Sequence, residues 1–139
     1  MIEIYTNSDI KHINISKLAE CASKVLKLEE SHIVNLELLE NEAIIALNKE
    51  FRGKDYLPDV LSFDYRQDKM FEHEISGEIF ISIEKATEQA KEKELPLNYE
   101  ILFLATHGLL HTLGFDHNND EEENEMKDKE YKIMNEYLK

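Results

Sequence analysis

Three histidines within one short segment are the residues of this chain whose types and spacing best suit chemistry. They are His107, His111 and His117, in the run HGLLHTLGFDH. If the segment before Gly114 is helical, His107 and His111 lie one turn apart on the same face, where both can bind one ion. Because glycine readily adopts the left-handed conformation that ends helices, the chain can turn at Gly114 and bring His117 back to that ion.

Three imidazoles and one open position for water are typical of a catalytic zinc site. We therefore expect one zinc ion per chain, although other divalent metals also accept this set of donors. A zinc ion held in this way lowers the pKa of a bound water toward ~7 and polarises a phosphoryl or carbonyl oxygen. Hydrolysis is the reaction class that these residues favour.

The segment that carries the first two histidines is apolar on nearly all sides, which indicates a buried helix. Its apolar residues are Ile101, Leu102, Phe103, Leu104, Ala105, Leu109, Leu110 and Leu113. A buried imidazole without a partner costs roughly 1–3 kcal/mol, so two of them on such a helix require a specific partner. His12, His32 and His73 have no other histidine at ligand spacing, and we interpret them as ordinary core or surface residues.

The spacing of the three histidines and the glycine equals that of the metzincin proteases, HExxHxxGxxH. In those enzymes the glutamate after the first histidine is the general base, and here that position is Gly108. The sequence therefore disfavours a protease, but it leaves this alternative open because a base could come from elsewhere.

The composition indicates a single domain, because a chain of 139 residues can bury a sufficient core without disulfides. A single cysteine fits a reducing compartment, and we find neither a signal-like start nor an apolar run of the ~20 residues that spans a bilayer. We therefore expect a cytoplasmic protein with no membrane partner. The net charge of −14 opposes binding to nucleic acid, which must be reconciled with any action on RNA.

Hydrophobic periodicity predicts an α+β fold, with a mixed four-stranded sheet and about five helices in one domain over residues 1–139. Asn41 and Asn98 are expected to cap the helices that follow them. The last helix carries an apolar stripe that we interpret as core, formed by Met126, Ile133, Met134, Tyr137 and Leu138. The predicted strands cover 2–5, 33–39, 60–64 and 78–83, and the predicted helices cover 15–26, 41–51, 84–95, 98–113 and 121–138.

Taken with two further motifs, the histidine segment resembles the YbeY family of bacterial endoribonucleases and rRNA maturation factors. HGLLHTLGFDH is similar to the family's HGxLHLxGYDH, LNKEFRGKDYLPDVLSF to LNxxYRxKDxPTDVLSF, and GEIFIS to GDIxIS. These motifs cover most of the chain in the family's order. The chain departs from the family pattern at Pro58, where the family has a threonine, and at Glu78, Thr112 and Phe115. None of these departures removes a candidate ligand.

The resemblance implies a metal-dependent endoribonuclease that is selective for single-stranded RNA and acts in 16S rRNA 3′-end maturation and ribosome quality control. It implies that His107, His111 and His117 hold the metal and that Arg52 contacts an RNA phosphate. A guanidinium suits that task because its planar donors can bind a phosphate bidentately. The alternative for Arg52 is a structural ion pair or a solvated surface position.

The partners implied are single-stranded rRNA and the small ribosomal subunit. Basic ribosomal proteins would complement the negative charge of the chain. A local basic patch is also conceivable around the third predicted strand, formed by Lys49, Arg52, Lys54, Arg66 and Lys69.

Asp116 has two interpretations. It is either a catalytic group that orients an imidazole or accepts a proton, or a simple turn former. For the whole chain, the interpretation without catalysis is a metal-stabilised ribosome assembly factor.

Overall fold

A computed structural model describes residues 1–10, 13–67 and 74–139 of the chain. Within these residues the fold is α+β, with the mixed four-stranded sheet and the five α-helices that the sequence predicts. The strands are β1 (Ile2–Tyr5), β2 (His32–Leu39), β3 (Val60–Asp64) and β4 (Gly77–Ser82). The helices are α1 (Ile15–Leu26), α2 (Asn41–Arg52), α3 (Ile83–Lys93), α4 (Leu97–Thr112) and α5 (Asp120–Leu138), and a short 3-10 helix, η1 (Tyr65–Gln67), follows β3.

The strand order is β1-β2-β4-β3, so β3 lies at an edge of the sheet beside the strand that follows it in sequence. The pairs β1–β2 and β2–β4 are parallel, and β3–β4 is antiparallel. Ser82 N donates to Asp59 O and Tyr65 N donates to Ser76 O, each at 2.9 Å. Because backbone hydrogen bonds alternate in direction along an antiparallel strand, the intervening residues Val60, Ser62 and Asp64 direct their N–H and C=O groups away from the sheet.

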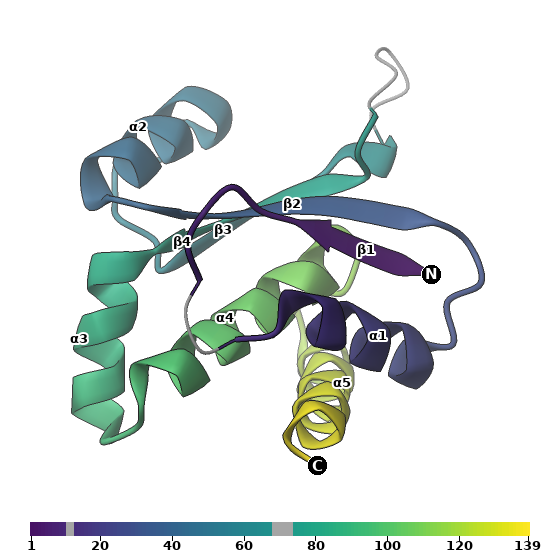
Figure 1. The fold of residues 1–139 in the computed structure, drawn as a ribbon. Coiled ribbons are helices and arrows are strands. Elements are labelled where there is room, and N and C mark those ends of the chain that lie inside the picture. Colours follow the sequence, from purple (N-terminus) through teal and green to yellow (C-terminus); the bar gives the residue numbers. More distant parts are fainter. Residues whose placement is uncertain (11–12, 68–73) are drawn as a thin grey trace.

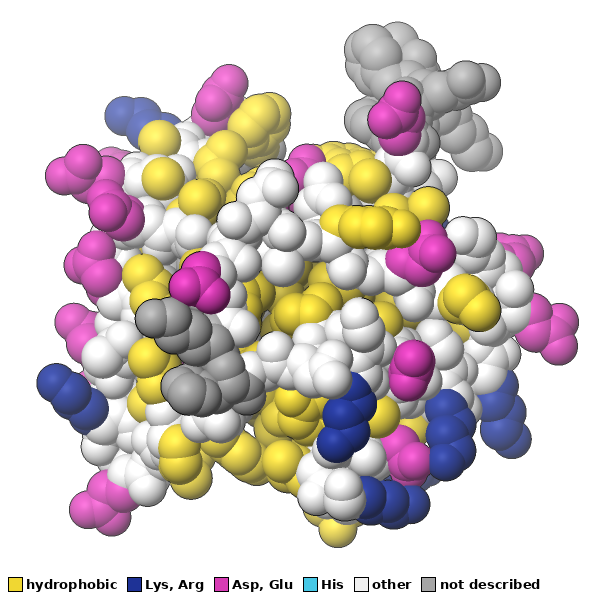
Figure 2. All heavy atoms as spheres, in the orientation of Figure 1, with side chains coloured by type: hydrophobic (Ala, Val, Ile, Leu, Met, Phe, Trp, Pro, Cys, Tyr) yellow, Lys and Arg dark blue, Asp and Glu magenta, His cyan; other side chains and the backbone are white. Residues whose placement is uncertain are grey.

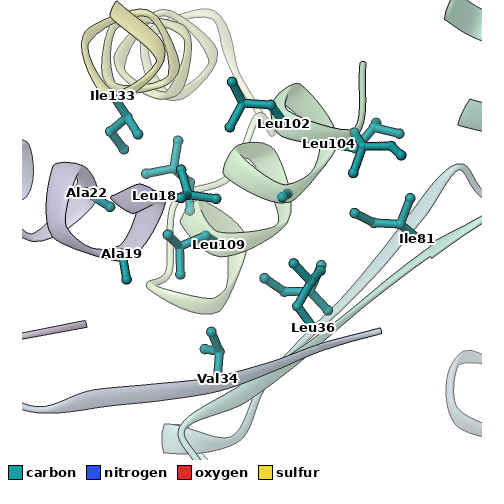
Figure 3. Close-up of a cluster of buried hydrophobic side chains, with 14 of the residues drawn as sticks. Leu18, Ala19, Ala22, Val34, Leu36, Ile81, Leu102, Leu104, Leu109 and Ile133 are labelled. Carbon is teal, nitrogen blue, oxygen red and sulfur yellow. The ribbon is translucent and has the colours of Figure 1, made fainter. Parts of the chain in front are cut away.

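One face of the sheet is covered by α1, α3, α4 and α5, and α2 lies on the other face (Figure 1). In the core, leucines of α4 lie between the strands and the outer helices α1 and α5 (Figure 3). Leu109 and Leu104, at 0% and 2% exposure, share this core with Leu36 of β2 and Ile133 of α5. The histidine-bearing helix is therefore the central, buried helix that its all-round apolar sequence predicts.

Two glycines allow α4 to pack closely against β3 and β4. A Cβ atom at Gly108 would lie 2.6 Å from Ile79 Cγ2 and 3.0 Å from Ser62 Oγ. A Cβ atom at Gly77 would lie 2.5 Å from Phe63 O and 2.9 Å from Thr112 Cβ. The helix that carries the histidines is thus held against the edge strand at a distance that only glycine permits.

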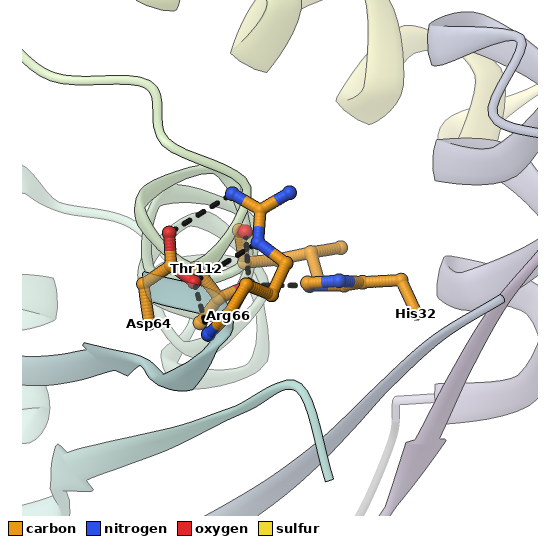
Figure 4. Close-up of polar contacts among 5 residues, drawn as sticks. His32, Asp64, Arg66 and Thr112 are labelled. Carbon is orange, nitrogen blue, oxygen red and sulfur yellow. Dashed lines mark hydrogen bonds and ion pairs between the residues drawn. The ribbon is translucent and has the colours of Figure 1, made fainter. Parts of the chain in front are cut away.

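A polar network surrounds the carboxyl end of α4 (Figure 4). Thr112 Oγ1 lies 2.6 Å from Leu109 O, to which it donates, and 3.0 Å from His32 Nε2, from which it accepts. Burial, together with the positive charge of Arg66, lowers the pKa of His32 to about 4. His32 is therefore a neutral, hydrogen-bonded core residue, as we interpreted it, whereas His12 and His73 lie outside the described residues.

Beside this network, Arg66 Nε and Nη2 each donate to Asp64 at 2.9 Å. Burial raises the pKa of Asp64, but the hydrogen bonds and the charge of Arg66 outweigh that effect and lower the pKa overall. Asp64 is therefore ionised and paired at neutral pH.

Some details of the helices differ from the predictions. The N-cap of α2 is Glu40, not Asn41, which instead donates from Nδ2 to Glu84 Oε2 at 3.0 Å. The N-cap of α4 is Pro96, whose carbonyl accepts from two amides of the first turn, so Asn98 is already helical.

Leu138, predicted to be core, is 54% exposed because it lies at the end of α5. None of the described helices combines the length and the hydropathy needed to cross a bilayer.

Candidate metal site

The three histidines predicted to bind a metal converge at the carboxyl end of α4. His107 and His111 project from one face of the helix, with their Nε2 atoms 3.1 Å apart and their ring centroids 4.6 Å apart. The helix ends at Thr112, and Gly114 takes a left-handed φ of +94°, as its position in the motif predicts. The turn brings the ring of His117 to 5.3 Å from that of His111.

The geometry of the trio is suited to one metal ion. One ligand nitrogen from each histidine lies within 4.8 Å of the others. Zinc–nitrogen bonds of about 2.0–2.1 Å require nitrogens about 3.3 Å apart at the tetrahedral angle, and never more than about 4.2 Å. The Nε2 atoms of His107 and His111, 3.1 Å apart, meet this requirement, and His117 lies on the exposed turn that completes the set.

The surroundings of His111 favour the neutral form that binds metals. Burial lowers the pKa of His111, and the positive charge of a protonated His107 would lower it further. A neutral imidazole keeps a lone pair on one ring nitrogen, which a ligand needs.

The histidines face a cleft of about 860 Å³ between α4, the edge strand β3 and α3. Ser62 and Asp64 of β3 line it, and Lys85 and Gln89 of α3 line its far side. The loop between α2 and β3 and the turn after α4 form other parts of the wall. The cleft is much larger than a metal ion needs, so a substrate can lie against the histidines.

Arg52, the last residue of α2, lines the same cleft. One Nη2 hydrogen bond joins it to the outward-facing carbonyl of Ser62, and its guanidinium carbon lies 5.4 Å from the centre of the Phe63 ring. No acidic residue among those described forms an ion pair with it. The guanidinium is thus fixed at the rim of the cleft with its other N–H groups available to a ligand. Its contact with RNA stays a prediction.

Comparison with known proteins agrees with this site. The family model described as Endoribonuclease YbeY matches residues 3–138. The chain belongs to the YbeY family. An Endoribonuclease YbeY of Bacillus licheniformis is 42% identical over 131 residues, which cover 88% of this chain and 83% of that protein. One of Carboxydothermus hydrogenoformans is 40% identical, covering 91% and 87% of the two chains.

The fold of a Thermotoga maritima protein, solved in solution, is similar with a TM-score of 0.65 and 30% identity, over 99% of this chain and 89% of that one. Because the chain belongs to the YbeY family, it is an enzyme. The members of this family are nucleases, which are hydrolases. Two of the three YbeY-like motifs line the cleft: LNKEFRGKDYLPDVLSF supplies Arg52 and Ser62, and HGLLHTLGFDH supplies the histidines. The third motif, GEIFIS, forms β4, which pairs with β3.

Asp116 is engaged by the turn rather than by an imidazole. Its Oδ1 accepts from His117 N at 2.8 Å, and its Oδ2 accepts from Asn118 Nδ2 at 3.1 Å. The first of these bonds is the main reason that the pKa of Asp116 is lowered. This is the geometry of a turn former, one of the two interpretations that the sequence left open, and a catalytic role of Asp116 stays a prediction.

The suggested basic patch contributes little to the cleft. Arg66 is paired with Asp64, and Lys49 and Lys54 are exposed outside the cleft wall. Lys69 lies outside the described residues.

Sequence reasoning missed the cleft wall from α3 and one residue that contacts a candidate ligand. Glu130 of α5 is 8% exposed, and its Oε1 lies 2.6 Å from His107 Nδ1. A signal was present, because Glu130 falls within the apolar stripe of the last helix, one turn after Met126 and before Ile133. A carboxylate within a buried stripe requires a partner, and the partner here is a candidate ligand.

Proposed function

We propose that this chain is a single-strand-specific metallo-endoribonuclease acting in 16S rRNA 3′-end maturation and ribosome quality control. The observation that carries the proposal is the convergence of three imidazoles, two of them with Nε2 atoms 3.1 Å apart, on a cleft that also presents Arg52. We further propose zinc as the ion, one per chain, in a single cytoplasmic domain over residues 1–139.

The residues of the chain have distinct tasks in this proposal. His107, His111 and His117 would hold the ion, which when bound supplies Lewis-acid chemistry for hydrolysis of a phosphodiester. Arg52 binds an oxygen of the scissile phosphate and stabilises the charge that develops there. Because the Ser62 carbonyl and the Phe63 ring already fix the guanidinium, little side-chain entropy is lost when it binds a phosphate.

The net charge of the chain bears on how RNA reaches the cleft. Acidic side chains are spread widely over the face shown in Figure 2 and are not confined to one patch. Long-range repulsion of phosphates therefore lowers the association rate with free RNA. We propose that the small ribosomal subunit and its basic proteins deliver the single-stranded rRNA.

A metalloprotease is a weaker alternative for two structural reasons. The position of the metzincin glutamate is Gly108, which is buried against β3 and β4 with no room for a side chain. Peptides commonly bind by adding a strand to an exposed sheet edge. Here the edge of β3 is partly closed, because Asp59 Oδ1 accepts from Val60 N at 2.8 Å and Arg52 donates to Ser62 O.

The test combines metal analysis with parallel substrates. Purified protein should contain close to one zinc ion per chain, and should cleave single-stranded RNA but not unfolded casein. His111→Ala should lose both metal and cleavage, whereas Arg52→Glu should keep the metal and the fold but lose cleavage. Degradation of casein alone would refute the nuclease proposal. Maturation of rRNA in cells by a metal-free variant would instead favour an assembly factor without catalysis.

A further inference from the structure

Glu130 is a buried carboxylate whose hydrogen-bond partner is a candidate metal ligand. It lies on the inner face of α5, beside Met126 and Ile133, and is 8% exposed. Ionised carboxylates are rarely buried unless a cation or several donors compensate them. No lysine or arginine among the described residues pairs with Glu130. Its ion-pair and hydrogen-bond partner is His107, through the 2.6 Å contact to Nδ1.

The contact determines which nitrogen of His107 carries the proton. An ionised carboxylate can only accept a hydrogen bond, so Nδ1 of His107 is the donor. In the neutral imidazole the lone pair is then on Nε2. That nitrogen faces His111 Nε2 at 3.1 Å, which is the side on which an ion would be bound. The carboxylate thus selects the tautomer that binds a metal.

The same contact also fixes the direction of the ring. Phe103, one turn earlier on α4, stacks on His107 with centroids 6.1 Å apart and planes at 27°. Stacking restrains the plane of the imidazole but permits a ~180° flip about the Cβ–Cγ bond, which would exchange the positions of Nδ1 and Cδ2. The hydrogen bond from Nδ1 to Glu130 removes this freedom, so Nε2 points toward the position of the ion.

We propose that Glu130 is a positioning residue of the metal site, through which α5 contributes to metal affinity without supplying a ligand. The inference rests on the proposed function only in requiring that the three histidines bind a metal. It assigns a role to a residue outside the histidine motif, at a separation of 23 positions from His107.

The chain offers a matched control for this proposal. Glu123 lies two helical turns before Glu130 on α5, and both line the same small cavity of about 140 Å³ behind His107 and His117. Glu123 pairs with Lys127 at 3.0 Å and has no hydrogen bond to a histidine among the described residues. Glu123→Gln and Glu130→Gln therefore remove the same charge near the site, but only the second changes the contact with His107.

The experiment measures zinc dissociation constants by competition with a chromophoric chelator, for the wild type, Glu130→Gln, Glu130→Ala and Glu123→Gln. Glu130→Ala should weaken zinc binding by about 10–100-fold, the usual effect of losing the partner of a ligating histidine. Glu130→Gln should weaken it less, because the amide oxygen can still accept from Nδ1. Glu123→Gln should stay within about twofold of the wild type, because this carboxylate is partly exposed and pairs with Lys127.

A second readout separates positioning from a structural role. The visible absorption bands of bound Co²⁺ should change in both Glu130 variants and remain as in the wild type in Glu123→Gln. Thermal unfolding of the metal-free proteins shows whether each variant folds, and Glu130→Gln preserves the shape of the side chain if Glu130→Ala does not fold. Zinc constants of the Glu130 variants within about twofold of the wild type would overturn the inference. A wild type that binds no zinc would instead overturn the proposed metal site itself.

Discussion

The glycine after the first histidine offers the sharpest test of how the fold builds the site. Replacing Gly108 with alanine adds one methyl group inside the contact between α4 and the sheet. The new Cβ would lie 2.6 Å from Ile79 Cγ2, 3.0 Å from Ser62 Oγ and 3.2 Å from Val60 Cγ2. Ile79 is 1% exposed, and a β-branched side chain in a strand has little rotamer freedom with which to move away.

Two opposing effects set the size of the change. Alanine is favoured over glycine within a helix by about 1 kcal/mol. Overpacking a well-filled core costs about 1–3 kcal/mol. Because the closest neighbour is a stiff, buried side chain, we expect the upper part of that range. Gly108→Ala should therefore lower the free energy of unfolding by about 1–2 kcal/mol. For a chain of 139 residues this corresponds to a Tm lower by about 3–10 °C.

Chemical denaturation of the metal-free protein measures this free energy without a contribution from ion binding. Ile79→Leu supplies the control, because leucine has no methyl group at the position of Cγ2. In that background the penalty of Gly108→Ala should shrink by about 0.5–1 kcal/mol, since residues in contact are not additive. A single variant Gly108→Ala as stable as the wild type, or more stable, would refute the argument from packing. It would also remove the structural objection to a side chain at the protease position.

Three further predictions concern the polar groups around the site. Burial depresses the pKa of His32 from 6.5 to about 4, so the unfolded chain takes up a proton before the folded one and the free energy of unfolding decreases as the pH falls from 6.5 to 4. His32→Gln should make this decrease shallower in denaturant titrations across that range, and an unchanged slope would contradict the assignment. Asn119→Ala removes the side-chain oxygen that accepts from Glu122 N at 2.8 Å and should cost about 1 kcal/mol, whereas Asn119→Asp should retain the cap. Zinc at about 100 times its dissociation constant should raise the free energy of unfolding by about 2.7 kcal/mol and a chelator should reverse this, whereas His111→Ala should show no shift if the histidines are the ligands.

Most of the secondary structure could be predicted because each element has a regular pattern of its own. The alternation in 78–83 and the helical spacing in 15–26 reflect single faces that pack on one core. Helix starts were less predictable. We expected the side chains of Asn41 and Asn98 to cap these two helices, but the N-cap residues are Glu40 and Pro96. The extended backbone of these two residues places the first helical turn one or two residues earlier. The strand order was not predictable by such patterns, because it depends on pairing between distant segments.

The metal site was predictable where its geometry is local. His107, His111 and His117 follow from one helix and one glycine turn, so their spacing in sequence already defines their arrangement in space. Glu130 and the cleft wall from α3 reach the site only through the packing of helices. That packing brings together residues with no regular separation in sequence, so no local pattern predicts it.

The unequal placement of the three histidines has a consequence for the kinetics of ion exchange. Two donors belong to the central helix α4, with their Nε2 atoms 3.1 Å apart, whereas the third is on the exposed turn that follows it. Loss of a bound ion should therefore begin at His117, the donor on the less constrained segment. The lifetime of the bound ion, more than the speed of its entry, should then depend on the residues that shape the loop between α4 and α5.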